Sequence, residues 1–389
     1  MENIRALVEQ CGLGTIEGEI SPVPGGLMHK MYKVQTTTGT YAVKCLNPEI
    51  MGRPDALKNY SEAERLERIL EDNGIPIVAA LSFDDLSIKS CDEKKMISIN
   101  GKYYYVFPWQ EGSITDFDAI TGEQCYKAGE ILGRIHAIEA NNISPEEPSL
   151  SEVDFDALLE CTKAKGKEVA KAKERAKVEE GVEAGESVIA KDSMIAPLLE
   201  ANLQLLKNAQ DKLNEARKNL PAMRAISNDD MDPKNIMWHE GNPHVIDLEC
   251  LGYSNPISSC LDLALQWSGT VNGKFNKDNL EAFFKGYLGA YDNGFRSYDE
   301  LFGIAYTWIE WLEYNIKRAL GRVSDDADEI RLGEVETKNT INRIKYLSSI
   351  EDDIRMVLQK LPIPDAESLI KNKYGWKMVE LLTDRHYLS

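Results

Sequence analysis

Candidate catalytic residues lie close together in segment 227–238, SNDDMDPKNIMW, and just after it. Asp230 and Asn235 are five residues apart, and Asp247 ends a short apolar run twelve residues beyond Asn235. This order of Asp, Asn and Asp is typical of phosphoryl transfer, in which one carboxylate accepts the proton of an attacking hydroxyl. The amide oxygen and the second carboxylate are ligands of the kind that Mg²⁺ ions on nucleotide phosphates require. We therefore expect Asp230 to be the base and Asn235 and Asp247 to be metal ligands.

Asp229 and Asp232 compete with Asp230 for the role of base. Only Asp230 has an Asn five residues downstream, because Lys234 and Met237 stand at that spacing from the other two. The spacing therefore selects Asp230. Taken alone, the segment has an alternative reading as an Asp-rich turn whose side chains cap local backbone groups.

A lysine in the predicted strand 40–46, TYAVKCL, is a candidate phosphate ligand. Strand alternation places Ala42, Lys44 and Leu46 on one face, so Lys44 has small and apolar neighbours. A lysine that follows small and β-branched residues near the end of a strand, as in A-V-K here, is typical of a lysine that contacts nucleotide phosphates. The alternative is a lysine on an edge strand that reaches solvent.

Such a lysine needs an acidic partner from the helix that follows. The predicted helix 56–70 offers Glu62 on its apolar face, whereas Glu64 points nearly opposite at about 100° per residue. We expect Glu62 to pair with Lys44, and Glu64 and Glu67 to belong to the solvated face.

The secondary structure predicted from the sequence changes near residue 112, from mainly strands to mainly helices. Before it, alternating segments broken by Pro and Gly predict an antiparallel sheet with one long helix, whereas helical periods dominate beyond it. We predict an α+β fold of two lobes, a small sheet lobe over 1–112 and a larger, mainly helical lobe over 113–389. The stretch 163–187 cannot bury a face, so we expect it to be a polar insertion, either a solvated helix or a loop.

The amino-acid composition and net charge limit the kinds of molecule that we expect this protein to bind. Asp and Glu number 64 against 45 Lys and Arg, a net charge of −19 that would repel nucleic acid but can attract cationic small molecules. The sequence has no signal-peptide pattern and no run of about 18 apolar residues, so we expect a cytoplasmic protein without a membrane partner. No segment indicates an obligate protein partner.

The chain resembles the aminoglycoside phosphotransferase and choline kinase-like family in the order and character of segments over about residues 20–270. These are PGGLMHKMYKV, YAVKCLN, EAERLERILEDNGIP, YVFPWQEG, AGEILGRIHAIE, DDMDPKNIMW, VIDLE and LDLALQW. The family comprises small-molecule kinases with the protein-kinase fold. The resemblance implies transfer of the γ-phosphoryl group of ATP or GTP, with Mg²⁺, to a hydroxyl of an aminoglycoside, an amino alcohol or a sugar.

The resemblance also implies roles for residues. Asp230 would be the base, Asn235 and Asp247 would bind Mg²⁺, and Lys44 with Glu62 would align the phosphates. Segment 107–112 would be the hinge whose backbone holds the nucleotide base, and the phosphate loop would follow the first strand. The nucleotide contacts implied in this way include Gly25, Gly26, Ala42, Phe107 and Trp109.

Two departures from the family pattern keep a second function open. Asn228 stands where the catalytic loop normally has His, although Asn can also donate and accept the hydrogen bonds that hold a loop. After Gly25 and Gly26 the sequence continues with Leu, Met and His rather than further glycines. The alternative is a non-catalytic nucleotide-binding pseudokinase module. His29, at the end of this loop, is expected to be an exposed turn residue.

Contacts to the acceptor must come from the helical lobe. The predicted helix 306–320, YTWIEWLEYNIKRAL, combines aromatic and acidic side chains that would suit an amine through cation–π contacts and ion pairs. The candidates are Trp308, Glu310, Trp311 and Tyr314. The alternative is that the tryptophans pack in the core.

Overall fold

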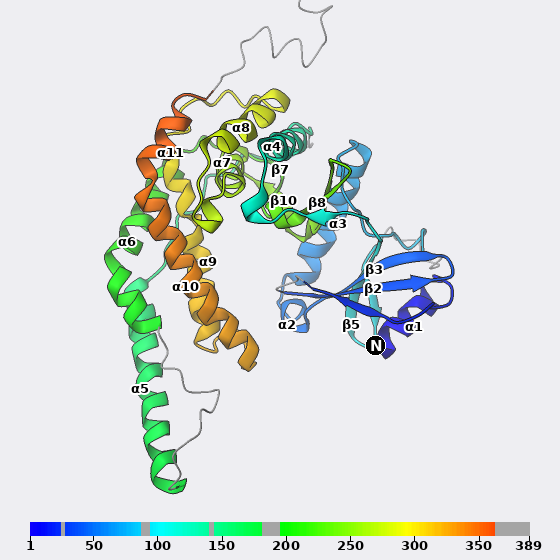
Figure 1. Cartoon of the computed structure of the whole chain (residues 1–389), viewed down its shortest axis with the longest axis horizontal. Coiled ribbons are helices and arrows are strands. Elements are labelled where there is room, and N and C mark those ends of the chain that lie inside the picture. Colours follow the sequence, from blue (N-terminus) through cyan, green and yellow to red (C-terminus); the bar gives the residue numbers. More distant parts are fainter. Residues whose placement is uncertain (25–27, 87–93, 140–143, 181–194, 362–389) are drawn as a thin grey trace, which may run out of the picture.

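The computed structural model describes residues 1–24, 28–86, 94–139, 144–180 and 195–361 of the 389-residue chain. An antiparallel sheet with three helices forms an N-terminal lobe, and a larger helical body forms a C-terminal lobe (Figure 1). The predicted α+β class is therefore confirmed. The boundary at residue 112 stays a prediction.

The N-terminal sheet has the strand order β1-β2-β3-β5-β4, and all its pairs are antiparallel. Its register places Lys44 opposite Tyr105 and Ala42 opposite Phe107. Val34, Val43 and Val106 are fully buried in one core cluster with side chains of α1. The elements of this lobe are α1 (Glu2–Gln10), β1 (Ser21–Val23), β2 (Lys30–Thr36), β3 (Gly39–Cys45), α2 (Pro48–Met51), α3 (Ala56–Asp72), β4 (Ile97–Ile99) and β5 (Lys102–Pro108).

The helix α3 and the segment after it connect the two lobes. Leu66 and Leu70 of α3 belong to the large core cluster of the C-terminal lobe. Beyond the helix, the N–H of Val78 donates to the carbonyl of Val245, and the N–H of Val245 donates to the carbonyl of Pro76, each at 2.8 Å. A main-chain seam thus joins the lobes behind the cleft.

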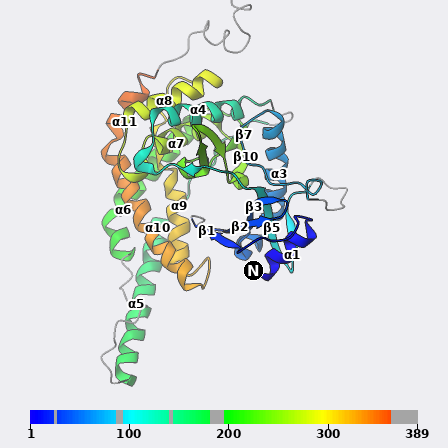
Figure 2. The same cartoon turned by 45° about the vertical axis from the view of Figure 1, so that its right-hand side comes forward.

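The C-terminal lobe surrounds short strands with helices (Figures 1 and 2). Its strands and short 3₁₀ helices are β6 (Ser113–Ile114), η1 (Phe117–Ala119), β7 (Ala225–Asn228), η2 (Pro233–Asn235), β8 (Ile236–His239), β9 (Asn242–Val245), η3 (Leu248–Cys250), β10 (Leu251–Ser254), η4 (Thr270–Asn272) and η5 (Phe302–Thr307). Its helices are α4 (Gly122–His136), α5 (Phe155–Glu180), α6 (Ile195–Asn219), α7 (Pro256–Trp267), α8 (Lys277–Ala290), α9 (Trp308–Ala319), α10 (Ala327–Ser349) and α11 (Glu351–Leu358).

Glycines allow α4 and α8 to pack backbone against backbone. A Cβ added at Gly129 would lie 2.1 Å from the carbonyl oxygen of Phe283, and one at Gly286 would lie 2.0 Å from that of Tyr126. No side chain fits at such distances, so only glycine permits this approach. The close packing of α4 and α8 buries His136 of α4 beneath the catalytic segment.

The predicted polar insertion is only partly described. Its first part is helical, because α5 continues to Glu180, and the end of this helix extends away from the rest of the lobe (Figures 1 and 2). Residues 181–187 lie outside the described residues.

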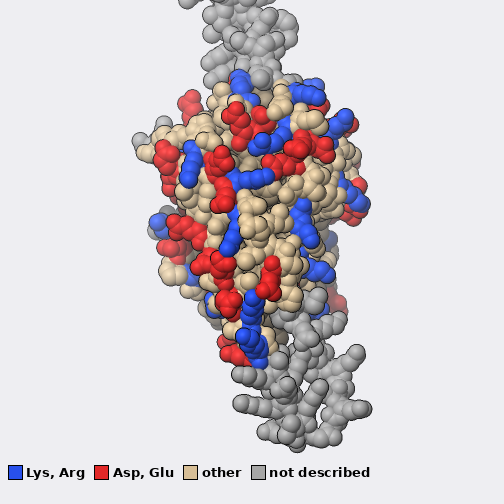
Figure 3. Space-filling view, turned by 90° about the vertical axis from the view of Figure 1, so that its left-hand side faces the viewer, with Lys and Arg blue, Asp and Glu red and all other residues tan. Residues whose placement is uncertain are grey.

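Charges of both signs alternate on the molecular face in Figure 3, so on this face the acidic excess does not gather into one patch. Within the described ranges, no helix is both long and apolar enough to cross a membrane.

Candidate active site

The catalytic segment begins where β7 ends, at Asn228, and η2 closes it. The side-chain amide of Asn235 donates to the carbonyl oxygen of Asp230 at 2.7 Å and to its Oδ2 at 2.9 Å. Asn235 is buried, whereas the Asp230 side chain keeps 41% of its surface exposed. The structure therefore brings the predicted base and one predicted metal ligand into direct contact, with the base at the open side.

The carboxylate of Asp229 is held by hydroxyl groups. Its Oδ1 accepts hydrogen bonds at 2.6 to 3.1 Å from three serines, Ser227, Ser254 and Ser259. These serines come from β7, β10 and α7, so Asp229 ties the start of the catalytic segment to the elements beneath it.

Asp232 is engaged locally as well. Its Oδ1 accepts from the N–H of Lys234 at 2.9 Å, and its Oδ2 pairs with Lys234 Nζ at 3.0 Å. The distance from Lys234 Nζ to Asp230 Oδ1 is longer, 3.7 Å. Asp229 and Asp232 are thus each held by several hydrogen bonds or ion pairs, whereas the closest side-chain partner of the Asp230 carboxylate is Asn235.

The environment of Asp230 changes its acidity. Removal from water raises the pKa of its carboxyl to about 6, and the negative charges of Asp232 and Asp247 add to this effect. Lys234 and the hydrogen bond from Asn235 oppose it. A carboxylate with this pKa is ionised at neutral pH and is a stronger base than an ordinary Asp.

Lys44 lies in β3 with only 5% of its surface exposed. Its Nζ is 2.9 Å from Asp247 Oδ1 and 2.7 Å from Glu249 Oε1. Burial lowers the pKa of Lys44, but the two carboxylates outweigh that effect and the net shift is upward. The predicted phosphate ligand and the second predicted metal ligand therefore meet as an ion pair between the lobes.

Asp247 has a left-handed backbone, with φ 58° and ψ 69°. Non-glycine residues with such angles are uncommon and often occur at functional sites. Here the turn connects β9 to η3 and leaves 39% of the Asp247 side chain exposed beside Lys44. The carboxylate can therefore contact both the lysine and a ligand.

The expected pairing of Glu62 with Lys44 is wrong. Glu62 is 42% exposed and binds the guanidinium of Arg65 at 2.7 and 3.0 Å. The apolar face on which Glu62 was placed packs toward the C-terminal core, because Leu66 belongs to that core. The partners of Lys44 come instead from the C-terminal lobe.

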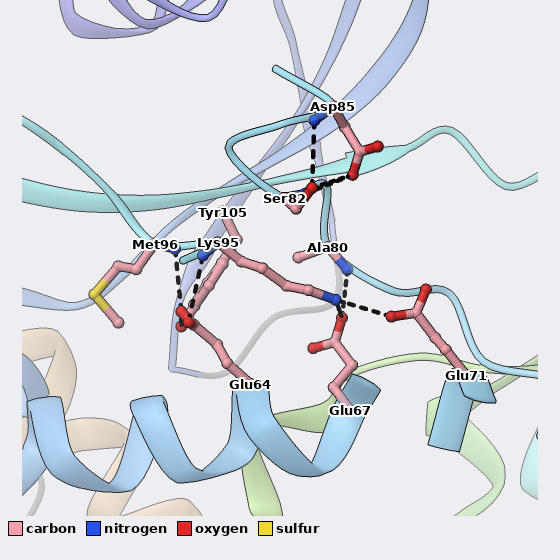
Figure 4. A network of polar contacts seen from close by, with 9 residues as sticks. All are labelled: Glu64, Glu67, Glu71, Ala80, Ser82, Asp85, Lys95, Met96 and Tyr105. Carbon is pink, nitrogen blue, oxygen red and sulfur yellow. Dashed lines mark hydrogen bonds and ion pairs between the residues drawn. The ribbon is translucent and has the colours of Figure 1, made fainter. Parts of the chain in front are cut away.

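The expectation that Glu64 and Glu67 are solvated is also wrong, because both are buried against the sheet (Figure 4). Glu64 accepts from Tyr105 Oη at 2.8 Å and from two backbone N–H groups, those of Lys95 and Met96. Glu67 Oε1 accepts from the N–H of Ala80 at 2.6 Å and from Lys95 Nζ at 2.8 Å. These bonds attach α3 to the strands.

Two residues of the site were not expected from the sequence, His29 and Glu249. His29 is not an exposed turn residue, because its side chain is 8% exposed and its Nε2 lies 2.9 Å from Glu249 Oε2. Burial raises the pKa of Glu249, but the contacts with His29 and Lys44 outweigh burial and lower it. The only signal in the sequence was the Glu two positions after Asp247, in VIDLE.

The predicted hinge, residues 107–112, begins within the last two residues of β5. The N–H of Trp109 donates to the carbonyl of Thr40 at 3.0 Å, and Lys33 Nζ lies 4.0 Å from the centre of the Trp109 ring. Phe107 is opposite Ala42 in the sheet. Gly25 and Gly26 lie outside the described residues. The nucleotide contacts assigned to these residues stay predictions.

The candidate acceptor residues of α9 do not converge on one point. Glu310 makes a bidentate ion pair with Arg217, at 2.6 and 3.0 Å. The guanidinium of Arg343 lies 3.6 Å above the ring of Trp308. Trp311 and Tyr314 stack on each other, with ring centres 5.4 Å apart. Two of the four side chains, Glu310 and Trp308, thus already hold an arginine of the protein.

A hollow of about 300 Å³ lies between the catalytic segment and the start of α9. Its lining includes Asp229, Tyr253, Ser258, Asp262 and Thr307. Burial raises the pKa of the Asp262 carboxyl to about 7, although a hydrogen bond from Gln266 at 2.9 Å partly opposes this. The hollow combines hydroxyl, carboxyl and aromatic groups, and Asp229, the residue before the predicted base, is part of its lining.

Several solved structures share this fold. Spectinomycin phosphotransferase APH(9)-Ia, in complex with ADP and spectinomycin, has a TM-score of 0.55 at 14% identity and covers 87% of this chain and 97% of its own. Amicoumacin kinase hAmiN, in complex with AMP-PNP, Ca²⁺ and Ami, has a TM-score of 0.53 at 12% identity. The match covers 88% of this chain and 94% of the kinase chain. Plasmodium vivax ethanolamine kinase has a TM-score of 0.50 at 15% identity, and the match covers 83% of this chain and 81% of the kinase chain. No curated protein matches the sequence.

The sequence also matches the model of the phosphotransferase enzyme family over residues 19–301. The match covers both lobes, from the strand before the phosphate loop to the residues before η5. It confirms the predicted enzyme class, a phosphotransferase, and the family resemblance of the segments. This protein therefore belongs to the phosphotransferase enzyme family.

Proposed function

We propose that this phosphotransferase moves the γ-phosphoryl group of ATP or GTP to a hydroxyl group of a small molecule. The observation that supports this most is the arrangement of two contacting pairs, Asn235 with Asp230 and Lys44 with Asp247, in which the charge of Asp247 also acts on Asp230. A base and a phosphate-binding cation are the parts that phosphoryl transfer requires, together with oxygen ligands for a metal.

In the proposed reaction, Asp230 orients the acceptor hydroxyl and accepts its proton. The hydroxyl oxygen bonds to the γ-phosphorus while the bond to the β,γ-bridging oxygen breaks, so a nucleoside diphosphate leaves. The raised pKa of Asp230 suits a base at neutral pH. No covalent intermediate on the protein is needed.

The residues fit a Mg²⁺ ion. The Nδ2 atom of Asn235 is used by Asp230, which leaves the Oδ1 atom for a cation. Asp247 gives one oxygen to Lys44 and keeps the other. Within the described ranges, no group of three or more His, Cys, Asp or Glu is placed to hold a metal. The remaining ligands of a Mg²⁺ ion at Asn235 and Asp247 would be phosphates and water. When bound, Mg²⁺ would neutralise charge on the phosphates.

Lys44 would contact the phosphates from the N-terminal lobe. Its burial and its two carboxylate partners keep the ammonium charged and restrict its position. Such a preorganised charge stabilises the transferred group without reorganising during the reaction. Phe107, Trp109 and Ala42 are proposed to line the site of the nucleotide base.

The acceptor is proposed to enter the hollow beside Asp229. The solved relatives named above are complexes with spectinomycin and Ami, and an ethanolamine kinase. A cationic aminoglycoside-like compound, an amino alcohol or a sugar would match the carboxyl and hydroxyl lining. Arg217 and Arg224, also in the lining, are already paired with Glu310 and Glu146.

The alternative, a pseudokinase module, rests on the irregular phosphate loop after Gly25 and Gly26 and on Asn228. The Oδ1 atom of this buried residue accepts from the N–H of Asp230 at 3.3 Å, so Asn228 does hold the catalytic segment. The side-chain nitrogen of Asn228 is buried without a hydrogen-bond partner, so Asn228 holds this segment through its oxygen alone.

The test is Mg²⁺-dependent nucleotide consumption with a panel of acceptors, cationic ones first. We expect Asp230→Asn to lower kcat by about 10²- to 10⁴-fold, the usual contribution of a general base. Asp211→Asn, on the exposed side of α6, is the matched control and should leave the rate unchanged. Tight nucleotide binding without turnover on any acceptor would establish the module instead.

A further inference from the structure

We propose that His29 is a positioning residue for the phosphate-binding lysine: His29 holds Glu249, and Glu249 holds Lys44. The proposal rests on the proposed function in one respect, the role of Lys44 at the nucleotide phosphates. His29 itself touches neither phosphate nor acceptor in this scheme.

The two oxygens of the Glu249 carboxylate contact two different partners, Lys44 and His29. Glu249 Oε1 lies 2.7 Å from Lys44 Nζ, and Glu249 Oε2 lies 2.9 Å from His29 Nε2. A carboxylate bound through both oxygens cannot rotate without losing a contact. The position of the ammonium therefore depends on the imidazole.

The proton on His29 is placed by a third contact. His29 Nδ1 accepts the N–H of Asn47 at 2.9 Å, so this nitrogen carries no hydrogen. The ring proton must then lie on Nε2, which faces Glu249. Asn47 caps the N-terminus of α2 directly after β3, so the imidazole is oriented by the same strand that carries Lys44.

The contacts lie in a dry environment. Side-chain exposure is 8% for His29, 6% for Lys44 and 19% for Glu249. Polar contacts are stronger at such low exposure, and removal of one partner costs more than at a surface.

The helix α3 supplies no carboxylate to Lys44 that could replace this arrangement. Glu62 pairs with Arg65, Glu64 accepts a hydrogen bond from Tyr105 of β5, and Glu67 binds the N–H of Ala80 and the side chain of Lys95. The α3 side chain at this point is Tyr60, whose hydroxyl lies 3.4 Å from His29 Nε2. Since Asp247 is also proposed to bind the metal, Glu249 is the partner that orients Lys44 throughout.

Two conservative variants separate the two bonds of His29. In His29→Gln, the side-chain amide nitrogen reaches about as far as Nε2, so it can still donate to Glu249 but offers Asn47 no acceptor. In His29→Asn, the shorter side chain can accept from Asn47 but cannot reach Glu249. His29→Ala removes both bonds, and His239→Asn at the exposed end of β8 is the control.

We expect His29→Ala and His29→Asn to weaken ADP binding by about 10- to 100-fold, the range for a hydrogen bond to a charged group. Adenosine, which lacks phosphates, should bind all variants equally, and His29→Gln should retain most of the ADP affinity. Calorimetric titration without metal measures these values, and thermal unfolding verifies folding. With an active acceptor, KM for the nucleotide should rise or kcat should fall in the same order.

The opposite order, with His29→Asn intact and His29→Gln impaired, would show that His29 only anchors the turn at Asn47. Unchanged ADP binding in all three variants would also overturn the proposal. If His29→Gln is impaired as well, a cycle with Glu249→Gln decides: additive losses refute coupling through Glu249, and non-additive losses support it. Because binding is measured without turnover, failure of the proposed function would not obscure the result.

Discussion

Two buried lysines of the N-terminal lobe, Lys44 and Lys95, each lie between two carboxylates, yet their surroundings differ. Lys95 Nζ binds Glu67 at 2.8 Å and Glu71 at 3.0 Å, and both partners belong to α3 (Figure 4). Lys44 Nζ binds Asp247 and Glu249, both of which belong to the other lobe.

The same arrangement, a buried lysine between two carboxylates, has different surroundings at Lys95 and at Lys44. Glu67 also accepts a backbone N–H, so the contacts of Lys95 form a closed connection between α3 and the segment before β4. The contacts of Lys44 end in the half-exposed Asp247, whose charge also acts on Asp230. Lys95 is a structural support, whereas Lys44 is placed to meet a ligand.

The largest effect should come from Lys95→Met. Loss of the cation leaves the buried Glu67 without its counter-charge, and we expect about 3 to 5 kcal/mol less free energy of unfolding. Urea denaturation measures this, and the double variant with Glu67→Gln should recover part of the loss. Per folded molecule, kcat/KM should change little. A Lys95→Met protein that is as stable as the wild type but has a low kcat/KM would contradict a purely structural role of Lys95.

Lys44→Met should have the opposite profile. We expect kcat to fall by about 10²- to 10³-fold, as for the removal of one preorganised electrostatic group. The midpoint of thermal unfolding should shift less than in Lys95→Met, because Glu249 keeps its contact with His29. Steady-state kinetics next to thermal unfolding of both variants tests this contrast directly.

His136 is a third buried ionisable residue with a structural role, and its protonation makes the stability of the fold depend on pH. Buried His136 contacts Tyr287 Oη at 2.8 Å and Ser227 Oγ at 3.0 Å, and burial lowers its pKa to about 3. Between that value and 6.5 the unfolded chain binds a proton that the folded chain does not, so stability falls as pH falls. From pH 6.5 to 5 the loss should be about 2 kcal/mol.

His136→Gln should flatten this acid dependence of the unfolding free energy, whatever its stability at neutral pH. Denaturation curves at both pH values for the two proteins give the difference in slope. Equal slopes would contradict a neutral His136.

The smallest effect should come from Glu62→Ala. Its pair with Arg65 is exposed, and such pairs contribute at most about 1 kcal/mol to stability. We expect kcat/KM to remain unchanged, in contrast to Glu249→Gln. Equal kinetic losses in the two variants would mean that the partner of Lys44 has been assigned wrongly.

The sequence was sufficient to predict the fold class, the family and the contact between Asp230 and Asn235, because these depend on local order and short spacing. The partner of Lys44 was not predictable in the same way. A helical wheel orients α3 relative to its apolar side, but this helix buries both sides, Leu66 toward one lobe and Glu64 toward the other. His29 was missed because its burial depends on Asn47 and Glu249, which are distant in the sequence.

The seam between the lobes places Asp247 by main-chain contacts alone. Val245, two residues earlier, uses both its N–H and its carbonyl to bind the segment after α3. Pro76 takes part with its carbonyl, the only hydrogen-bonding group that a proline backbone has. These two hydrogen bonds join backbone atoms only, so the chain two residues before the Asp247 carboxylate is fixed to the other lobe without a side-chain hydrogen bond.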